Sequence, residues 1–196
     1  AYWMKVHEIP EASRTARGAH IKALLPVAPN EETTTVVALK EFSETENLFM
    51  ATARGVVKKV KTNDFVNAKT RGIIAINLDE GDKLVSALLT KGDDEVVIIS
   101  RKGQALRINE KQVRAMGRAS RGVSGMRLDS DDEIAGVLRV DDVNKMLVLS
   151  EYGYGKRVDF SEFTVHGRGT GGQKIYTISE KTGDIVGCAT VTDGDM

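Results

Sequence analysis

The sequence predicts an all-β fold built from repeated four-stranded units, and three observations support it. Glycines recur with a period close to 50 residues in two series, Gly55, Gly103, Gly153 and Gly72, Gly122, Gly172. Between them lie short β-prone runs that are separated by glycine or acidic turns. No apolar stripe with helical spacing extends for more than about one turn. A period near 50 residues that is made of short strands is typical of propeller-like arrays.

The repeats are expected at residues 1–46, 47–94, 95–144 and 145–196, each about 50 residues long. In the second repeat the four strands are expected at 48–52, 56–60, 72–78 and 83–89. The corresponding runs of the later repeats are 96–100, 104–108, 122–128 and 133–140, and then 146–150, 155–158, 173–178 and 184–191. Each run contains Val, Ile or Leu, which fit a pleated and half-buried surface.

The first repeat shows the same order of strands and turns as the others, except that its first strand is missing. Residues 3–6 are expected to be extended. Pro10 should end this strand, because proline cannot donate to a strand ladder. Further strands are expected at 21–25 and at the β-prone run 33–39. Since the chain begins inside a repeat and stops after a fourth strand, we expect it to be part of a longer protein.

Two segments are the candidates for helix. Asp64–Lys69 and Asn109–Met116 each lack an apolar stripe longer than one turn, so short helical turns are the most that either should form.

Composition limits the class of protein. A hydrophobic content of 41% in 196 residues is sufficient for a core, and it comes mainly from aliphatic residues because aromatic residues make up 5%. No apolar run approaches the length of about 18 residues that a membrane span needs, so no membrane association is expected. The single cysteine, Cys188, cannot form an internal disulfide, which favours a reducing cytoplasmic location.

The formal net charge of zero conceals an uneven distribution. Residues 53–72 carry six positive and one negative charge, and residues 101–122 carry seven and one. The segments between them carry the acidic turns. The pattern predicts that positive and negative charge lie at opposite edges of each repeat, so that a neutral chain presents one strongly positive face.

The basic residues at these recurring positions are the candidate nucleic-acid contacts. Clustered cations attract backbone phosphates without recognising sequence, because neutralising the phosphates releases condensed counterions. The alternative is that these charges form ordinary solvated faces. The expected DNA-binding residues are Lys5, Arg14, Arg17, Arg54, Lys58, Lys59, Lys69, Arg71, Arg101, Lys102, Arg107, Arg114, Arg118, Arg121, Lys156, Arg157 and Arg168.

Other site patterns are weak. Residues 167–172 satisfy the G-x-G-x-x-G dinucleotide pattern, but a β-prone run follows where that motif requires a helix. The histidines His7, His20 and His166 occupy unrelated repeat positions without metal-ligand spacing. The carboxylate clusters lie on expected turns. We therefore expect no catalytic residues, no metal site and no cofactor in this chain.

Four segments in order resemble the C-terminal domain of the bacterial DNA gyrase A family. They are YWMKVHEIPEASRTARG, FMATARGVVKKVKTNDF, VRAMGRASRGVSGMRL and YGYGKRV. The resemblance covers essentially the whole chain and corresponds to the second to fifth blades of that family. The motif QRRGGKG, which marks the family's first blade, does not occur in this sequence.

The resemblance implies a β-pinwheel, a propeller-like disc of four-stranded antiparallel blades in which neighbouring blades exchange strands. Such domains wrap duplex DNA around a basic rim and support negative supercoiling. The implied partners are double-stranded DNA, the remainder of gyrase A, and gyrase B. ATP and Mg are expected only for the full enzyme, whose catalytic regions are not in this chain.

Two alternatives remain beside a DNA-wrapping module. One is the C-terminal domain of the corresponding polypeptide of topoisomerase IV, which has a similar fold, although its blades are typically more degenerate than these repeats. The other is a protein-interaction propeller whose charged loops bind a partner protein. On the DNA-wrapping hypothesis, reversing Lys58 and Lys59, or Arg118 and Arg121, to glutamate should weaken DNA binding and flatten its salt dependence without unfolding the protein.

Overall fold

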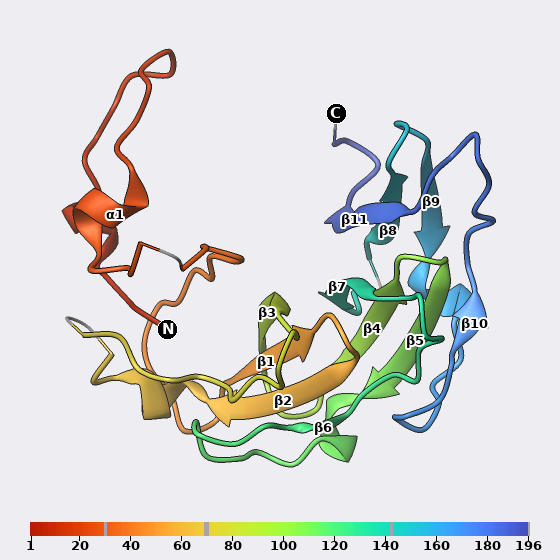
Figure 1. The fold of residues 1–196 in the computed structure, drawn as a ribbon, viewed down its shortest axis with the longest axis horizontal. Helices are drawn as coiled ribbons and strands as arrows, with labels where there is room; N and C mark the ends of the chain where they lie inside the picture. Colours follow the sequence, from red (N-terminus) through yellow and green to blue (C-terminus); the bar gives the residue numbers. More distant parts are fainter. Residues whose placement is uncertain (30, 69–70, 142, 196) are drawn as a thin grey trace.

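The computed structural model describes residues 1–29, 31–68, 71–141 and 143–195. Its described part contains eleven β-strands, all in antiparallel sheets, and only short helical segments (Figure 1). The predicted all-β class with four-stranded blades is thus confirmed.

The first sheet combines strands of two repeats. Its strands β1 (Asn47–Thr52), β2 (Val56–Lys61) and β3 (Leu84–Thr90) come from the second repeat, and β6 (Val123–Ser124) comes from the third. The order is β3-β1-β2-β6, so that Val57 of β2 pairs with Val123 of the following repeat.

The second sheet repeats this arrangement. Strands β4 (Glu95–Ser100), β5 (Gln104–Asn109) and β7 (Ile134–Arg139) are joined by β10 (Gln173–Lys174) from the fourth repeat, in the order β10-β5-β4-β7. The third sheet has the order β11-β8-β9 and consists of β8 (Lys145–Ser150), β9 (Gly155–Asp159) and β11 (Ile185–Val191). The strand exchange expected of a pinwheel is present.

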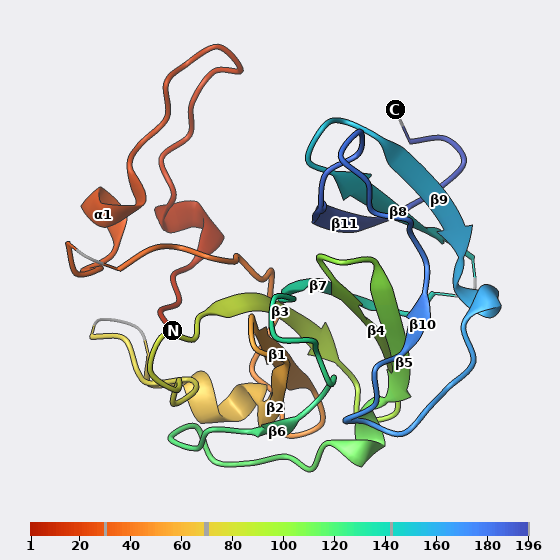
Figure 2. The same cartoon turned by 45° about the vertical axis from the view of Figure 1, so that its right-hand side comes forward.

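The three sheets follow one another along an arc, and much of the first repeat extends away from it (Figure 2). Its two ends contact the second repeat, because Ala1 bonds to Ile73 and Phe42 packs near Met50 and Phe65. The fourth strands β3, β7 and β11 contact one another in succession, which places them on the inner side. One hydrophobic cluster, which includes Phe49, Ile98 and Leu106, fills the space between the first and second sheets. A second cluster, which includes Met146 and Phe160, lies between the second and third sheets.

Short 3₁₀ turns follow each second strand. They span Thr62–Phe65 (η2), Glu110–Gln112 (η3) and Phe160–Glu162 (η4). The turn η3 lies within the candidate Asn109–Met116, whereas η2 overlaps only the beginning of Asp64–Lys69, whose last residue lies outside the described residues. Neither described segment forms more than a short turn, as expected.

The first repeat is where the strand prediction was wrong. Residues 3–6, 21–25 and 33–39 contain no strand; instead a 3₁₀ turn spans Val6–Glu8 (η1) and a single α-helical turn spans Ile21–Leu24 (α1). β-prone residues form a strand only where a neighbouring strand accepts and donates their hydrogen bonds. Among the described residues of this repeat, Ala1 exchanges backbone hydrogen bonds with Ile73, while Ser43 and Glu46 only accept one each, from Asn63 and Thr62.

The third strands are shorter than the sequence predicts. Residues 72–78 form no strand, and β6 and β10 have two residues each. The chain bends after β6 and after β10, because in each case two successive backbone N–H groups donate to one carbonyl in the hairpin turn of the preceding blade. Gly125 and Met126 both donate to Gly55 O, at 2.8 and 3.2 Å, and Ile175 and Tyr176 both donate to Gly103 O. The segment therefore crosses over the hairpin turn of the preceding blade.

Gly55 is required at this crossing. Its φ is +81°, and a Cβ would lie 2.5 Å from Met126 O. Gly153 occupies the equivalent turn of the last sheet with a φ of +82°, and a Cβ there would meet nothing within 4 Å. We expect Gly55→Ala to lower the free energy of unfolding by about 3 kcal/mol and Gly153→Ala by about 1 kcal/mol. Urea denaturation measures the free energy of unfolding of both variants. Equal losses would mean that the segment crossing Gly55 moves aside without a cost in free energy.

Candidate nucleic-acid interface

The second strands carry basic residues that the structure places inside the fold. Lys58 of β2 is fully buried, and its Nζ donates to Ala75 O and Ser120 O at 2.9 Å and also to Arg118 O. Burial next to the Arg118 guanidinium lowers the pKa of Lys58 to about 8. A side chain in this position cannot contact DNA.

Lys59 points to the opposite side of β2 and is also buried. Its Nζ lies 3.1 Å from the Glu110 carboxylate and donates to Glu110 O at 3.0 Å. Glu110 is fully buried, and it also accepts from Thr90 Oγ1 and from the amides of Gly92 and Asp94. Lys59 therefore joins the second blade to the third.

Arg107 occupies the same position in β5 and makes the same connection one blade later. Its Nη1 donates to Phe160 O at 2.8 Å and to Phe163 O at 3.1 Å, while its Nε donates to Glu95 at 2.6 Å. Lys58, Lys59 and Arg107 were predicted to contact DNA, but in the structure their side chains are engaged in hydrogen bonds inside the fold. Alternation along a strand turns these side chains toward neighbouring blades, where backbone carbonyls and carboxylates accept their hydrogen bonds.

A second group of cations lies at the acidic turns. The Arg54 amide donates to Asp82 Oδ1 at 3.1 Å, and its Nη1 donates to Glu80 O at 3.0 Å. Lys102 Nζ lies 3.2 Å from Asp184, and Arg101 Nε lies 3.7 Å from the same carboxylate. The expectation that positive and negative segments occupy opposite edges was wrong for these three, because the hairpin turn and the acidic turn meet at one end of the blade.

The basic loops lie at the outer edge of the sheets. After η3, Ala115 and Met116 run beside Lys59 at the end of β2, and Val123 and Ser124 pair with its beginning. The loop between them, residues 117–121, thus follows the free side of β2. The loop after η4 lies beside β5 in the same way, because His166 N donates to Arg107 O at 2.9 Å.

Several cations at this edge are open to solvent. Arg114 is exposed and Arg118 is partly exposed, and neither side chain forms an ion pair with a described residue. Arg71 of the second repeat is exposed as well, but it precedes residues 72–78, which form no strand. Arg121 is also exposed, but its Nε lies 2.7 Å from both oxygens of Asp79. These hydrogen bonds hold the pKa of Asp79 below its ordinary value.

The glycine-rich loop 167–172 belongs to the same edge. It precedes the strand β10, as the sequence predicts, whereas the dinucleotide motif requires a helix there. Arg168 is exposed, but its Nε donates to Gln112 O at 3.1 Å and its Nη1 to Ser124 O at 3.0 Å. This arginine is therefore partly used to hold its own loop.

Two exposed cations of the outer edge were not predicted from the sequence. Arg127 follows β6, and its amide donates to Thr170 O at 3.0 Å, which brings it beside the loop of the fourth repeat. Lys174 lies on β10 itself. Both residues follow the glycine that ends a basic segment, Gly122 or Gly172, so the charge pattern assigns them to the acidic segments. The exchange of third strands between blades is the signal that would have placed them at the edge.

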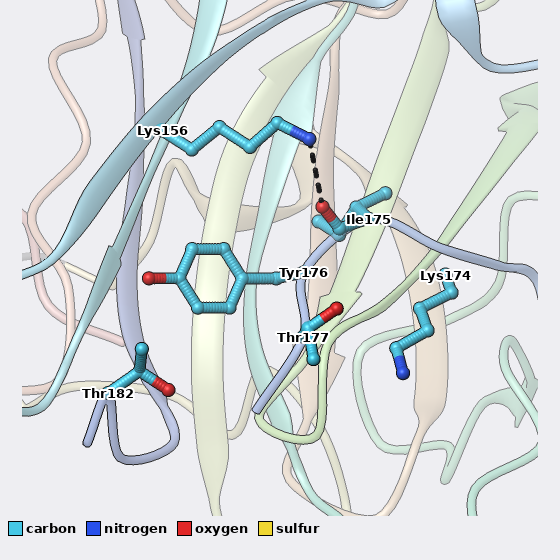
Figure 3. A pocket seen from close by; sticks show the side chains of 6 residues that line it. All are labelled: Lys156, Lys174, Ile175, Tyr176, Thr177 and Thr182. Atoms are coloured by element: carbon cyan, nitrogen blue, oxygen red, sulfur yellow. Dashed lines mark hydrogen bonds between the residues drawn. The ribbon is translucent and has the colours of Figure 1, made fainter. Parts of the chain in front are cut away.

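The last second strand, β9, carries Lys156 and Arg157, both exposed. Lys156 Nζ donates to Ile175 O at 3.3 Å and lines an open pocket together with Lys174, Tyr176 and Thr182 (Figure 3). Arg157 Nη1 lies 3.3 Å from Asp193.

The remaining predicted contacts lie near the beginning of the chain or outside the description. Lys5, Arg14 and Arg17 are exposed on the segment that extends away from the sheets. Lys69 lies outside the described residues.

The described residues contain no group of histidine, cysteine, aspartate or glutamate side chains that could hold a metal ion. Nor does this part of the chain include a helix that is long and apolar enough to cross a membrane. What the outer edge offers is a row of guanidinium and ammonium groups beside small loop residues. Such groups can bind phosphate oxygens along a nucleic-acid backbone.

Comparison with known proteins decides the family. The family model described as "DNA gyrase C-terminal domain, beta-propeller" matches residues 1–40, 46–91, 94–141 and 144–192. The chain belongs to the DNA gyrase C-terminal domain family. It is 68% identical to the DNA gyrase A protein of Treponema pallidum over 195 residues, which is 100% of this chain and 24% of that protein.

Further relatives agree with this family. The DNA gyrase A protein of Clostridium acetobutylicum is 48% identical over 99% of this chain and 23% of that protein. This chain thus spans about a quarter of the length of both gyrase relatives. A solved structure of a DNA gyrase A C-terminal domain superposes with a TM-score of 0.83 at 31% identity, covering 91% of this chain and 60% of that one.

The topoisomerase IV alternative shares the fold. The crystal structure of a DNA topoisomerase IV C-terminal domain superposes with a TM-score of 0.82 at 26% identity, covering 96% of this chain and 59% of that one. The gyrase family is favoured over this alternative by the family model and by the 68% identity to a gyrase A protein.

Proposed function

We propose that this chain is a non-catalytic module that binds and bends duplex DNA along its outer edge and so supports negative supercoiling by DNA gyrase. The observation that carries the proposal is the alignment of exposed cations on the loops and exchanged strands of successive blades. The proposed contacts are Arg71, Arg114, Arg118, Arg121, Arg127, Arg168 and Lys174.

The physical basis of the proposal is additive phosphate binding. Bending a duplex through a tight turn costs several kcal/mol by elastic estimates, roughly 1–6 kcal/mol for a site of 20–30 base pairs. No single repeat presents more than four of these cations, so one blade cannot offset that cost alone. Successive blades along the arc can, and because phosphate contacts carry no sequence information, binding should be nearly sequence-independent.

The proposal assigns the chemistry to other parts of the enzyme. We infer that ATP and Mg act in the remainder of gyrase A and in gyrase B, and that this chain itself takes no cofactor. A cytoplasmic location beside the chromosome follows from that role. A protein-interaction propeller remains the alternative, since the same cations could bind an acidic partner.

Duplex length distinguishes the two functions. Affinity for duplexes of about 20 and about 150 base pairs is measured across a salt titration, by filter binding or by fluorescence anisotropy. We expect binding that falls steeply with salt and that strengthens with length by more than the number of available sites. Weak binding that does not depend on length would contradict wrapping and would favour a protein partner.

A further inference from the structure

The loop of residues 117–121 is fastened to the preceding repeat along one side. Lys58 Nζ donates to Arg118 O and Ser120 O. Asn77 donates its Nδ2–H to Ala119 O at 2.9 Å and its backbone N–H to Ser120 O at 3.0 Å. Three successive carbonyls of this loop therefore accept hydrogen bonds from the inner side, and the fully buried lysine donates to two of them.

The guanidinium of Arg118 takes no part in this fastening. The side chain is partly exposed and forms no hydrogen bond or ion pair with a described residue. It is close enough to Lys58 for the two positive charges to repel each other. The loop is thus held in shape by its backbone, and its arginine is left available.

The fourth repeat shows what happens without the lysine. Its loop has the same internal contacts, because Thr170 Oγ1 donates to Gly167 O as Ser120 Oγ donates to Gly117 O. The position of Lys58 is occupied by Leu106 of β5. There the loop arginine supplies part of the fastening, since Arg168 donates to Gln112 O and Ser124 O. The Arg127 amide also donates to Thr170 O, as the Asn77 amide donates to Ser120 O, and Gln112 Nε2 donates to His166 O.

We propose that Lys58 is a positioning residue of the DNA-binding edge: it fastens loop 117–121 from inside and thereby frees the Arg118 guanidinium for a phosphate. Arg168, whose loop has a leucine at the lysine position, is the weaker contact of the two. The inference rests on the proposed function, because it assigns a role to one residue within the same edge.

Protonation of Lys58 strengthens this fastening. The ammonium has three N–H donors for three carbonyls, whereas the neutral amine has two. Burial and Arg118 lower its pKa to about 8, and Arg118 is the one charged side chain among the described residues that acts on it appreciably. A bound phosphate would offset the repulsion between the two cations. Raising the pH through about 8 deprotonates Lys58 in the free protein, so DNA affinity should fall in that range.

A double-mutant cycle on the intact protein tests the coupling. We expect Arg118→Ala to lower the affinity for a duplex of about 150 base pairs about 5-fold and to reduce the salt slope by about one. Lys58→Leu should cause a similar loss. The cost of Arg118→Ala should shrink to less than about 2-fold in the Lys58→Leu background, because the arginine then folds back onto its own loop. An undiminished cost there, or a folded Lys58→Leu variant with unchanged affinity, would overturn the proposal.

Two further measurements keep the test decisive if Lys58→Leu does not fold. Asn77→Ala removes one exposed fastening bond and should weaken binding about 2-fold. In the protein with Lys58 intact, the loss of DNA affinity caused by Arg118→Ala should be smaller at about pH 9.5 than at about pH 7. A loss of affinity that does not change with pH would count against the proposal. Arg114→Ala separates the two hypotheses. If it weakens DNA binding but the cost of Arg118→Ala does not depend on Lys58, the proposed function stands and this inference fails. If no arginine variant changes the affinity, the proposed function itself fails.

Discussion

Replacing Glu110 by alanine is expected to lower the free energy of unfolding by about 3–5 kcal/mol, because it leaves the buried ammonium of Lys59 without its partner carboxylate. Glu110 is fully buried and accepts from Thr90 Oγ1 at 2.7 Å and from the amides of Gly92 and Asp94 at 2.6 and 3.0 Å. The substitution therefore removes the acceptor of three donors as well as half of an ion pair. Denaturation in urea measures the loss.

The matched control is Asp93→Asn. Asp93 lies between Gly92 and Asp94, whose amides donate to Glu110. It pairs with Lys111 at 2.6 Å, but its side chain is 70% exposed. Exposed pairs contribute less than about 1 kcal/mol, so this variant should be nearly neutral. Combining Lys59→Met with Glu110→Ala should cost less than the sum of the single changes, because the double variant buries no unpaired charge. A loss below about 1 kcal/mol for Glu110→Ala would show that water or a rearranged side chain replaces the carboxylate.

The same contacts change the expectation for reversing Lys58 and Lys59. Glutamate at position 59 would put a second carboxylate next to Glu110 inside the fold, and glutamate at position 58 would face three carbonyl oxygens. We therefore expect these reversals to destabilise the protein. Any loss of DNA binding that they cause would not identify a contact surface.

The second large effect is expected for the double reversal Arg114→Glu and Arg118→Glu. Both residues lie on the outer-edge loop between η3 and β6, and neither side chain has an ion-pair partner among the described residues. The change shifts the local charge by four and replaces attraction with repulsion of phosphates. We expect the affinity for a long duplex to fall about 100-fold at low salt, with a smaller salt slope.

A charge-matched control lies at the acidic turns. Lys83 pairs with Glu133 at 3.5 Å, and Lys181 lies 5.4 Å from the ring centroid of Tyr154. Reversing both lysines changes the net charge by the same amount at the other edge of the blades. We expect an effect of less than about 3-fold on duplex affinity. Equal losses in the two double variants would mean that net charge, rather than the outer edge, governs binding.

The class of fold and the repeat could be predicted from the order of residues alone. The series Gly55, Gly103 and Gly153 marks the hairpin turns, and at the first two the next repeat crosses so closely that a Cβ would collide with Met126 O or Tyr176 O. The arginine loops could be predicted as well, because Arg114 and Arg118 lie between two such turns. These features are local: they depend on backbone conformation and spacing along the chain.

Which cations reach solvent depends instead on how the blades are assembled. Lys58 and Arg118 are both basic residues of the repeat, yet one is fully buried and the other is partly exposed. The difference arises because Lys58 lies on β2, which is covered by neighbouring segments, whereas Arg118 lies in a loop at the edge, and because the third strands of the third and fourth repeats pair with the blade before them. That exchange brings carbonyls from residues 75, 118 and 120 around Lys58, and it places Arg127 and Lys174 at the edge. Contacts between segments that lie dozens of residues apart are not encoded in the local pattern of charge.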